Sequence, residues 1–184
     1  LSEQYFKADP HSAHKPKVFH LEYHGNYFSF ETDAGVFSRD ALDEGTRLLL
    51  DAVSPLISGK VLDLGCGWGA VGIILSKLHP DCVITMIDIN QRACGLAERN
   101  AGLNGVSPRV LCDDGLEITG ESYNWILLNP PIRAGKQTVY GLYRRSAASL
   151  NPGGCLSVVI RKQQGASSSK TELESLFHTV ILEQ

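Results

Sequence analysis

One stretch, VLDLGCGWG at residues 61–69, most constrains how this chain of 184 residues can fold. Its apolar start is typical of a buried strand, and AVGIILSKL from residue 70 onward has the apolar spacing of a helix. Between them, Gly65, Gly67 and Gly69 can adopt positive φ angles and bring backbone N–H groups close to a ligand. The pattern predicts a strand, a ligand-binding loop and a helix. A plain turn between a strand and a helix is the alternative, but such a turn does not need three alternating glycines.

The position of Asp63 narrows the choice of ligand. Gly65, Gly67 and Ala70 also satisfy the G-x-G-x-x-G/A fingerprint of dinucleotide sites, so a nicotinamide-dependent oxidoreductase is one alternative. A carboxylate at residue 63 would repel a pyrophosphate on the loop, whereas it could hold an ammonium group. S-adenosylmethionine carries an ammonium group and lacks a pyrophosphate. We therefore expect S-adenosylmethionine as the cofactor.

Length and composition indicate one domain without special stabilising devices. The five cysteines form no C-x-x-C pair, as is typical of reduced thiols, and Cys66 in the glycine loop is the candidate reactive one. The histidines near the start of the chain fit no tight ligand spacing, so no metal is expected. No stretch approaches the roughly 18 apolar residues of a membrane span. We expect a cytoplasmic, monomeric protein without a membrane partner.

The net charge of −3 disfavours a general binder of polyanions, but the basic residues are unevenly distributed. From residue 129 onward there are seven Lys and Arg against three Glu. If several of these basic residues share one face, they could contact the phosphates of RNA. The alternative is that they are ordinary solvated charges. The residues are Arg133, Lys136, Arg144, Arg145, Arg161, Lys162 and Lys170.

The chain divides into a leader, a hairpin and a core. Residues 1–17 are polar and aperiodic, and we expect a flexible leader. Residues 18–34 form a hairpin extension, because apolar and polar residues alternate on both sides of Gly25-Asn26. Residues 35–184 complete a single domain with the hairpin. Its last strand, beginning near Thr179, is expected to be cut short by the end of the sequence.

Within the core, helical and strand patterns alternate. This predicts a Rossmann-like α/β fold with a mainly parallel sheet flanked by helices, and ligands at the carboxyl ends of the strands. A helix start is expected near Asp43, Glu44 and Thr46, and a polar loop at 161–170. Further helices are expected at 70–79, 91–103, 137–150 and 171–178, and strands at 61–64, 82–88, 106–112, 123–128 and 155–160, with a turn at 151–154.

Acidic residues follow two of these strands. Asp88 lies 23 residues after Gly65 at the end of a strand, where a carboxylate can accept hydrogen bonds from both ribose hydroxyls. Capping of the helix from Gln91 is the alternative role. Asp113 and Asp114 follow the next strand, and either could accept a hydrogen bond from an adenine amino group.

The second informative motif is NPPI at 129–132, directly after a strand. Two adjacent prolines end the strand and leave neighbouring carbonyls without partners. The side-chain oxygen of Asn129 and the carbonyl of Pro130 can then face one planar N–H₂ group. Such acceptors hold an exocyclic amine and stabilise positive charge that develops on its nitrogen during attack on a methyl group.

Three motifs together resemble the small-domain (MTS) family of class I S-adenosylmethionine-dependent methyltransferases, which includes guanine-N2 methyltransferases of small-subunit ribosomal RNA. They are GVFSRDALDEGTRLLL at 35–50, VLDLGCGWG at 61–69 and NPPIRAGK at 129–136. The resemblance implies an RNA partner, cofactor contacts from Asp63, Gly65, Cys66, Gly67, Asp88, Ile89, Asp113 or Asp114, and Asn129, and catalytic contacts from Asn129, Pro130 and Pro131. It further implies substrate contacts from Phe37, Ile132, Arg133 and Lys136.

Two features depart from the family pattern. Related adenine-N6 and glutamine-N5 enzymes carry an aromatic residue after the prolines, and here that residue is Ile132. A second, degenerate N-terminal copy of the domain, present in enteric members, is absent from this sequence. We expect guanine N2 of ribosomal RNA as the acceptor. Methylation of a protein glutamine amide or a small molecule, or a catalytically silent RNA-binding module, are the alternatives.

Overall fold

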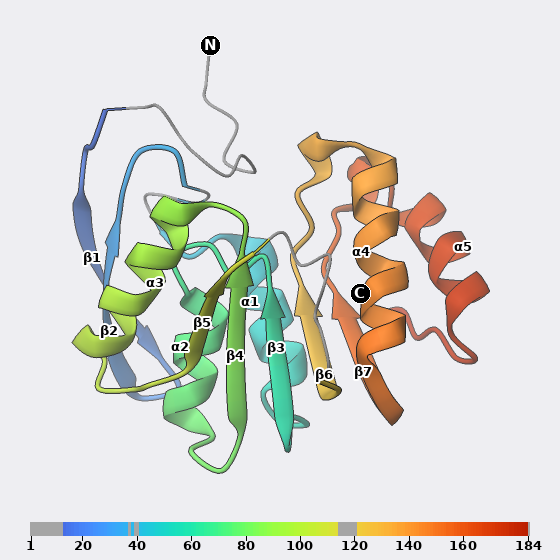
Figure 1. Ribbon diagram of the computed structural model, residues 1–184, viewed down its shortest axis with the longest axis horizontal. Coiled ribbons are helices and arrows are strands. Elements are labelled where there is room, and N and C mark those ends of the chain that lie inside the picture. Colours follow the sequence, from blue (N-terminus) through green and yellow to red (C-terminus); the bar gives the residue numbers. More distant parts are fainter. Residues whose placement is uncertain (1–12, 37, 39–40, 114–120, 184) are drawn as a thin grey trace.

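The computed structural model of the chain describes residues 13–36, 38, 41–113 and 121–183. Within these ranges a hairpin precedes alternating strands and helices (Figure 1). The strands are β1 (Lys17–Tyr23), β2 (Asn26–Thr32), β3 (Lys60–Leu64), β4 (Val83–Asp88), β5 (Arg109–Cys112), β6 (Tyr123–Leu128) and β7 (Leu150–Val158). The helices are α1 (Glu44–Val53), α2 (Ala70–Leu78), α3 (Gln91–Leu103), α4 (Lys136–Ser149) and α5 (Ala166–Leu176), with short 3-10 turns η1 (Ile132–Ala134) and η2 (Lys162–Gln164).

The central sheet has the order β5-β4-β3-β6-β7, and every neighbouring pair is parallel. The predicted α/β fold is therefore confirmed. The order changes direction between β3 and β6, since β4 and β5 extend the sheet on one side and β6 and β7 on the other. At such a point the connections diverge and open a crevice outside the carboxyl ends of the strands.

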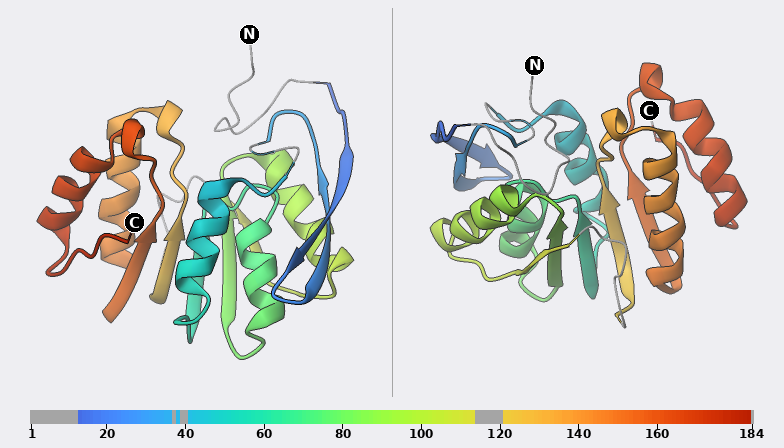
Figure 2. Two further views of the ribbon diagram at one scale, coloured as in Figure 1. Left: turned by 180° about the vertical axis from the view of Figure 1, so that it is seen from behind. Right: turned by 45° about the horizontal axis from the view of Figure 1, so that its top comes forward.

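Side chains alternate along the strands and build a core on each face of the sheet. One core joins Val61, Met86 and Leu127 to α1, α2, α3 and the hairpin. The other joins Leu62 and Ile126 to α4 and α5. Figure 2 shows α1 and α2 in front of the sheet when the molecule is seen from behind, whereas α4 stands in front of it in Figure 1.

The N-terminal hairpin is confirmed, but its turn lies one residue earlier than predicted. Tyr23 pairs with Asn26, and the two turn residues, His24 and Gly25, have φ angles of 48° and 73°. Two successive positive φ angles match the right-handed twist of the flanking strands. Residues 1–12 of the expected leader lie outside the described residues, and the N–H of Lys15 donates to the Asp33 carboxylate at 2.5 Å.

Three boundaries differ from the prediction. β5 starts at Arg109 rather than at residue 106, because the N–H of Val106 donates to Ala101 and closes the end of α3 after Gly105 at φ 68°. β7 includes the expected turn at 151–154, where the β6–β7 register shifts. Helix α5 occupies part of the expected loop, and residues 179–183 form no strand.

Candidate active site

The change of strand order places the ends of β3 and β6 side by side, with Leu64 opposite Leu128. A cavity of about 780 Å³ opens there. Twelve of the predicted site residues line it, and they come from both halves of the strand order, β5-β4-β3 and β6-β7. They are Asp63, Gly65, Cys66, Gly67, Asp88, Ile89, Asp113, Asn129, Pro130, Pro131, Ile132 and Arg133.

The glycine loop has the expected backbone and is tied to its neighbouring strand. Gly65, Gly67 and Gly69 have φ angles of 77°, 57° and 91°. The N–H groups of Gly65 and Cys66 both donate to the carbonyl of Ile87, at 2.8 and 2.9 Å. These two donors hold the loop on β4. A Cβ added at Gly65 or Gly67 would meet no atom within 4 Å, so the loop leaves room where side chains would otherwise stand.

Asp63 lies deep between β3 and α2. Its side chain accepts the N–H of Gly72 at 3.0 Å, and the residue is 5% exposed. Burial raises the pKa of Asp63 to about 7; the Gly72 hydrogen bond opposes this shift and the nearby Asp88 carboxylate adds to it. A buried acid at the wall of a cavity regains its charge when a cation binds beside it.

Asp88 ends β4 and joins the loop that follows β3 to the loop that follows β4. Its carboxylate accepts the N–H of Gly67 at 2.8 Å and the N–H of Asn90 at 2.8 Å. Burial raises its pKa, and these hydrogen bonds oppose the rise. The capping role considered for Asp88 belongs instead to Asn90, whose side chain accepts from the N–H groups of Arg92 and Ala93.

The expectation that Cys66 is reactive is wrong. Its side chain is buried, and burial together with the neighbouring carboxylates raises the pKa of the Cys66 thiol well above its ordinary value. A protonated thiol is a poor nucleophile. Cys66 is therefore part of the packed wall of the site.

The other residues predicted to contact the cofactor or the substrate do not all line the cavity. Asp113 follows β5 beside β4, and its N–H donates to the Asp88 carbonyl at 3.0 Å. Phe37 and Asp114 lie outside the described residues. Lys136 begins α4 and is exposed, and it is not among the described residues that line the cavity.

The Asn-Pro-Pro segment forms a tight turn, and the expectation of unpartnered carbonyls is wrong. The Pro130 carbonyl accepts the N–H of Ile132 at 2.9 Å around Pro131 at φ −74° and ψ 78°, which is an inverse γ-turn. The Pro131 carbonyl accepts the N–H of Ala134. The prolines have no N–H donors, but the N–H groups of the residues after them donate to the proline carbonyls as the chain turns into η1. A carbonyl has two lone pairs, so Pro130 can still accept a second hydrogen bond.

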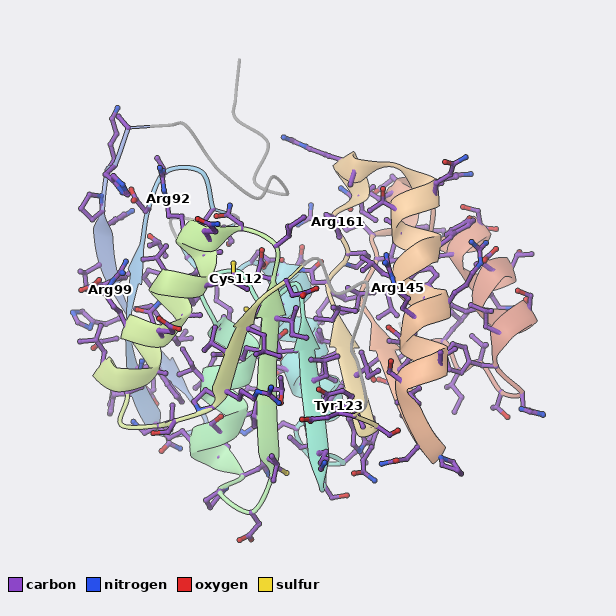
Figure 3. The ribbon with its side chains drawn as sticks, viewed as in Figure 1. Arg92, Arg99, Cys112, Tyr123, Arg145 and Arg161 are labelled. Carbon is purple, nitrogen blue, oxygen red and sulfur yellow. The ribbon has the colours of Figure 1, made fainter. Side chains whose placement is uncertain are left out.

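The basic residues after residue 129 do not gather into one continuous rim around the cavity, which would have been the most direct support for binding of a nucleic acid. Arg133 and Arg161 line the cavity, whereas Arg144 pairs with Glu172 on α5 at 2.6 Å. In Figure 3, Arg161 lies beyond the carboxyl ends of the strands, and Arg145 lies alongside α4. The basic side of the cavity is thus made by the segments that follow β6 and β7.

Sequence reasoning missed several polar residues of the site. Thr46 appeared only as part of a helix start, yet it lines the cavity and accepts a hydrogen bond from Asn129 at 3.1 Å. Asn90 and Gln164 were not singled out and also line the cavity. The position of Asn90 after a strand and before a helix is a signal that could have identified it.

Neither a metal centre nor a membrane span is found in the part of the chain that the structure describes. No three His, Cys, Asp or Glu side chains gather there in a way that could hold a metal ion. None of the helices there combines the length and the apolar character needed to cross a bilayer.

Comparison with known sequences identifies relatives along most of the chain. The family model described as methyltransferase small domain matches residues 27–183. The uncharacterized protein YbxB of Bacillus subtilis is 37% identical, over 100% of this chain and 94% of its own length. Ribosomal RNA small subunit methyltransferase C of Vibrio cholerae is 35% identical over 81% of this chain, but the match spans only 47% of that enzyme.

Solved structures share the fold. The 16S rRNA N2 G1207 methyltransferase (RsmC) of T. thermophilus, in complex with AdoMet and guanosine, superposes with a TM-score of 0.79 and 23% identity, over 89% of this chain and 46% of that one. A ribosomal protein L11 methylase from Lactobacillus delbrueckii subsp. bulgaricus gives a TM-score of 0.63 and 19% identity, over 76% of this chain and 70% of that one. At these identities the likeness concerns the fold alone.

Proposed function

The chain belongs to the methyltransferase small domain family, and on this premise we propose that it methylates an exocyclic amine, guanine N2 of small-subunit ribosomal RNA, using S-adenosylmethionine. The observation that carries the proposal is the cavity where β3 and β6 meet. It combines the acidic, glycine-rich wall of Asp63, Gly65 and Asp88 with the amide of Asn129. One wall suits a cationic nucleoside and the other suits an amine.

The residues of the acidic wall fit S-adenosylmethionine. Asp63 is buried and Asp88 is partly buried, so the charge of both carboxylates is disfavoured without a cation nearby, and the ammonium group of this ligand would provide one. The cradle beside Gly65 and Gly67 has room that a Cβ would fill. When bound, S-adenosylmethionine supplies an electrophilic methyl group carried on a sulfonium sulfur.

The residues of the second wall would hold the acceptor. Asn129 Oδ1 and the Pro130 carbonyl accept hydrogen bonds from the exocyclic N–H₂ group and keep its lone pair directed at the methyl. The same acceptors stabilise the positive charge that develops on the nitrogen, after which a proton leaves to water. Ile132 offers an aliphatic contact to the base where related enzymes carry an aromatic ring.

Three observations favour an RNA acceptor. The named relative from Vibrio cholerae is a ribosomal RNA methyltransferase, and the T. thermophilus structure with guanosine shares the fold. In addition, Arg133 and Arg161 line the acceptor side of the cavity and can meet phosphates next to the target base. Methylation of a protein amide or a small molecule gives no reason for this placement of charge.

Three measurements test the proposal. Calorimetric titration with S-adenosylmethionine should show saturable binding to the wild type and much weaker binding to folded Asp88→Ala protein. Ribosomal RNA from a deletion strain should lack a guanine N2-methyl group that the wild-type gene restores. Asn129→Ala should lower the rate of methylation at least about tenfold. Binding of NADH without binding of S-adenosylmethionine would overturn the cofactor class, and unchanged RNA methylation in the deletion strain would overturn the acceptor.

A further inference from the structure

The start of helix α1 carries a polar pair that the proposed chemistry has not yet used. Asp43 is the N-cap of α1, and its Oδ1 accepts the N–H of Thr46 at 3.2 Å. The second carboxylate oxygen, Oδ2, accepts the hydroxyl of Thr46. Thr46 is 7% exposed, so its hydroxyl has little access to water as an alternative partner. One oxygen of the Asp43 carboxylate thus caps a backbone N–H of the first helical turn, and the other accepts the hydroxyl of Thr46.

The same hydroxyl contacts Asn129, which lies 83 residues later in the chain. Asn129 Nδ2 donates to Thr46 Oγ1 at 3.1 Å, and both residues line the cavity. Residue 45, next to Thr46, is glycine, and a side chain there would crowd the Asp43 cap more than the strand ends. A Cβ at Gly45 would stand 3.6 and 3.7 Å from the two methyl carbons of Val159 and 3.2 Å from Asp43 Oδ1, which is closer than most Cβ contacts.

The direction of these hydrogen bonds follows from simple proton counting. A carboxylate only accepts, so the single hydroxyl proton of Thr46 is directed at Asp43. The hydroxyl oxygen then has only lone pairs to offer Asn129, and only the N–H₂ branch of that amide can bind to it. The amide oxygen of Asn129 is therefore the branch left for a donor arriving in the cavity.

We infer that the Asp43–Thr46 pair is a positioning device that fixes the amide orientation of Asn129, so that its oxygen and not its N–H₂ group meets the acceptor amine. The inference rests on the proposed function, because only an amine acceptor needs an oxygen at this point. With the amide reversed, two N–H₂ groups would face each other and the hydrogen bond to the acceptor would be lost. Asp43 and Thr46 touch neither methyl donor nor acceptor in this scheme and act through Asn129.

Asp43→Asn is the sharpest test, since it keeps the size and the capping oxygen of residue 43. Its N–H₂ group would replace Oδ2 and donate to Thr46, whose proton would then turn to Asn129 and reverse that amide. Thr46→Val removes the hydroxyl, and Thr46→Ser restores it. Asp51→Asn on the same helix is the matched control, because Asp51 lies outside the cavity lining and accepts from Tyr23.

We expect kcat for RNA methylation to fall at least about tenfold in Asp43→Asn and in Thr46→Val, with Kd for S-adenosylmethionine and the melting temperature little changed. Thr46→Ser and Asp51→Asn should stay within about twofold of the wild type. Thr46→Val combined with Asn129→Ala should be no slower than Asn129→Ala alone, because the pair acts through that amide. Wild-type kcat in both Asp43→Asn and Thr46→Val would overturn the inference.

An NMR readout separates this inference from the choice of substrate. The side-chain amide protons of Asn129, assigned by their loss in Asn129→Ala, should shift in Asp43→Asn and Thr46→Val and return in Thr46→Ser. If they shift while wild-type protein leaves ribosomal RNA unmethylated, the positioning device stands and the proposed acceptor fails. If neither variant moves them, the device is wrong whatever the substrate.

Discussion

At the scale of single residues, the site depends on acids kept in an unfavourable environment. Asp63 is buried beside Asp88, and burial raises the pKa of both carboxyls. The N–H of Gly72 donates to the Asp63 carboxylate, but this one hydrogen bond opposes the effect of desolvation only in part. Such an acid gains most from a cationic ligand, since binding restores the charge that folding disfavours.

Binding of S-adenosylmethionine should therefore depend on pH through Asp63. With a pKa of about 7 in the ligand-free protein, the carboxyl is mostly protonated at pH 6 and mostly ionised at pH 8. If the cation requires the ionised form, affinity rises about tenfold from pH 6 to pH 8. Calorimetry in two buffers of different ionisation enthalpy should detect proton release near pH 6. Asp63→Asn should bind more weakly and show a much flatter profile; an equally steep profile would contradict the assignment to Asp63.

The same pKa shift predicts how stability changes without ligand. Because the folded pKa of Asp63 is raised above its unfolded value of 3.8, the folded state holds the proton more tightly. Its contribution to stability is complete below about pH 4 and is lost as pH rises toward 7. The free energy of unfolding of the wild type, measured with urea, should thus fall relative to that of Asp63→Asn as pH rises across this interval. A constant difference between the two proteins would contradict the prediction.

At the scale of elements, the N-terminal hairpin is joined to α3 by two asparagines one helical turn apart. Asn104 Oδ1 accepts the N–H of Ser29 at 3.0 Å and its Nδ2 donates to the Ser29 carbonyl at 2.8 Å. Asn100 makes the same pair of hydrogen bonds with Glu31 and also donates to the Trp68 carbonyl at 2.9 Å. These amides satisfy the open edge of β2 as a neighbouring strand would, and Asn100 links the hairpin to the glycine loop.

Asn100→Asp should destabilise the protein by at least about 2 kcal/mol. The substitution preserves shape and the acceptor for the Glu31 N–H, but it removes the donor and brings a buried carboxylate against the carbonyls of Glu31 and Trp68. Urea unfolding measures the loss. Asn26→Asp, in the exposed part of the hairpin, is the control and should change stability by less than about 0.5 kcal/mol. Equal effects of the two substitutions would show that the buried amide is not what holds the hairpin.

The elements most easily predicted from sequence are those in which the spacing of apolar residues reflects which side chains are buried. β3, α2, β4 and α3 match their predicted positions closely because each carries a continuous apolar run or a helical apolar face. Helix α5 was predicted five residues late, because its first turn is rich in serine. One of these serines, Ser169, is held by a tertiary contact, because it accepts a hydrogen bond from the Tyr143 hydroxyl at 3.2 Å. Local propensity contains no information about such contacts.

The candidate site shows the same division. Asp63, Gly65, Asp88 and Asn129 lie at or just after the carboxyl ends of strands. Since a parallel sheet brings these ends to one edge, their meeting could be predicted. The contact of Thr46 with Asn129 could not, because it depends on how closely α1 approaches β6.

At the scale of the whole molecule, the strand order separates charges within one cavity. Asp63, Asp88 and Asp113 line the side made by β3, β4 and β5, whereas Arg133 and Arg161 line the side that follows β6 and β7. Asp43 also lines the cavity, and its carboxylate is engaged by Thr46. Arg161 pairs with Glu44 at 3.5 Å, but both side chains are mostly exposed, so this pair contributes little and can give way to a phosphate. An acidic side of the cavity thus faces a basic side, which is the arrangement that the proposed cationic donor and RNA acceptor would need.

Arg133→Gln and Arg161→Gln should therefore weaken RNA binding without affecting the cofactor. Each arginine that neutralises one phosphate contributes about 1 to the slope of log affinity against log salt concentration, so each substitution should lower that slope by about 1. The measurement is fluorescence anisotropy with small-subunit ribosomal RNA fragments over a series of salt concentrations, alongside calorimetry with S-adenosylmethionine, whose Kd should stay within about twofold. Arg99→Gln is the control, because Arg99 lies on α3 away from the cavity and pairs with Glu31 (Figure 3). Slopes lowered equally by all three substitutions would mean that RNA is attracted by total charge rather than held at the acceptor side of the cavity.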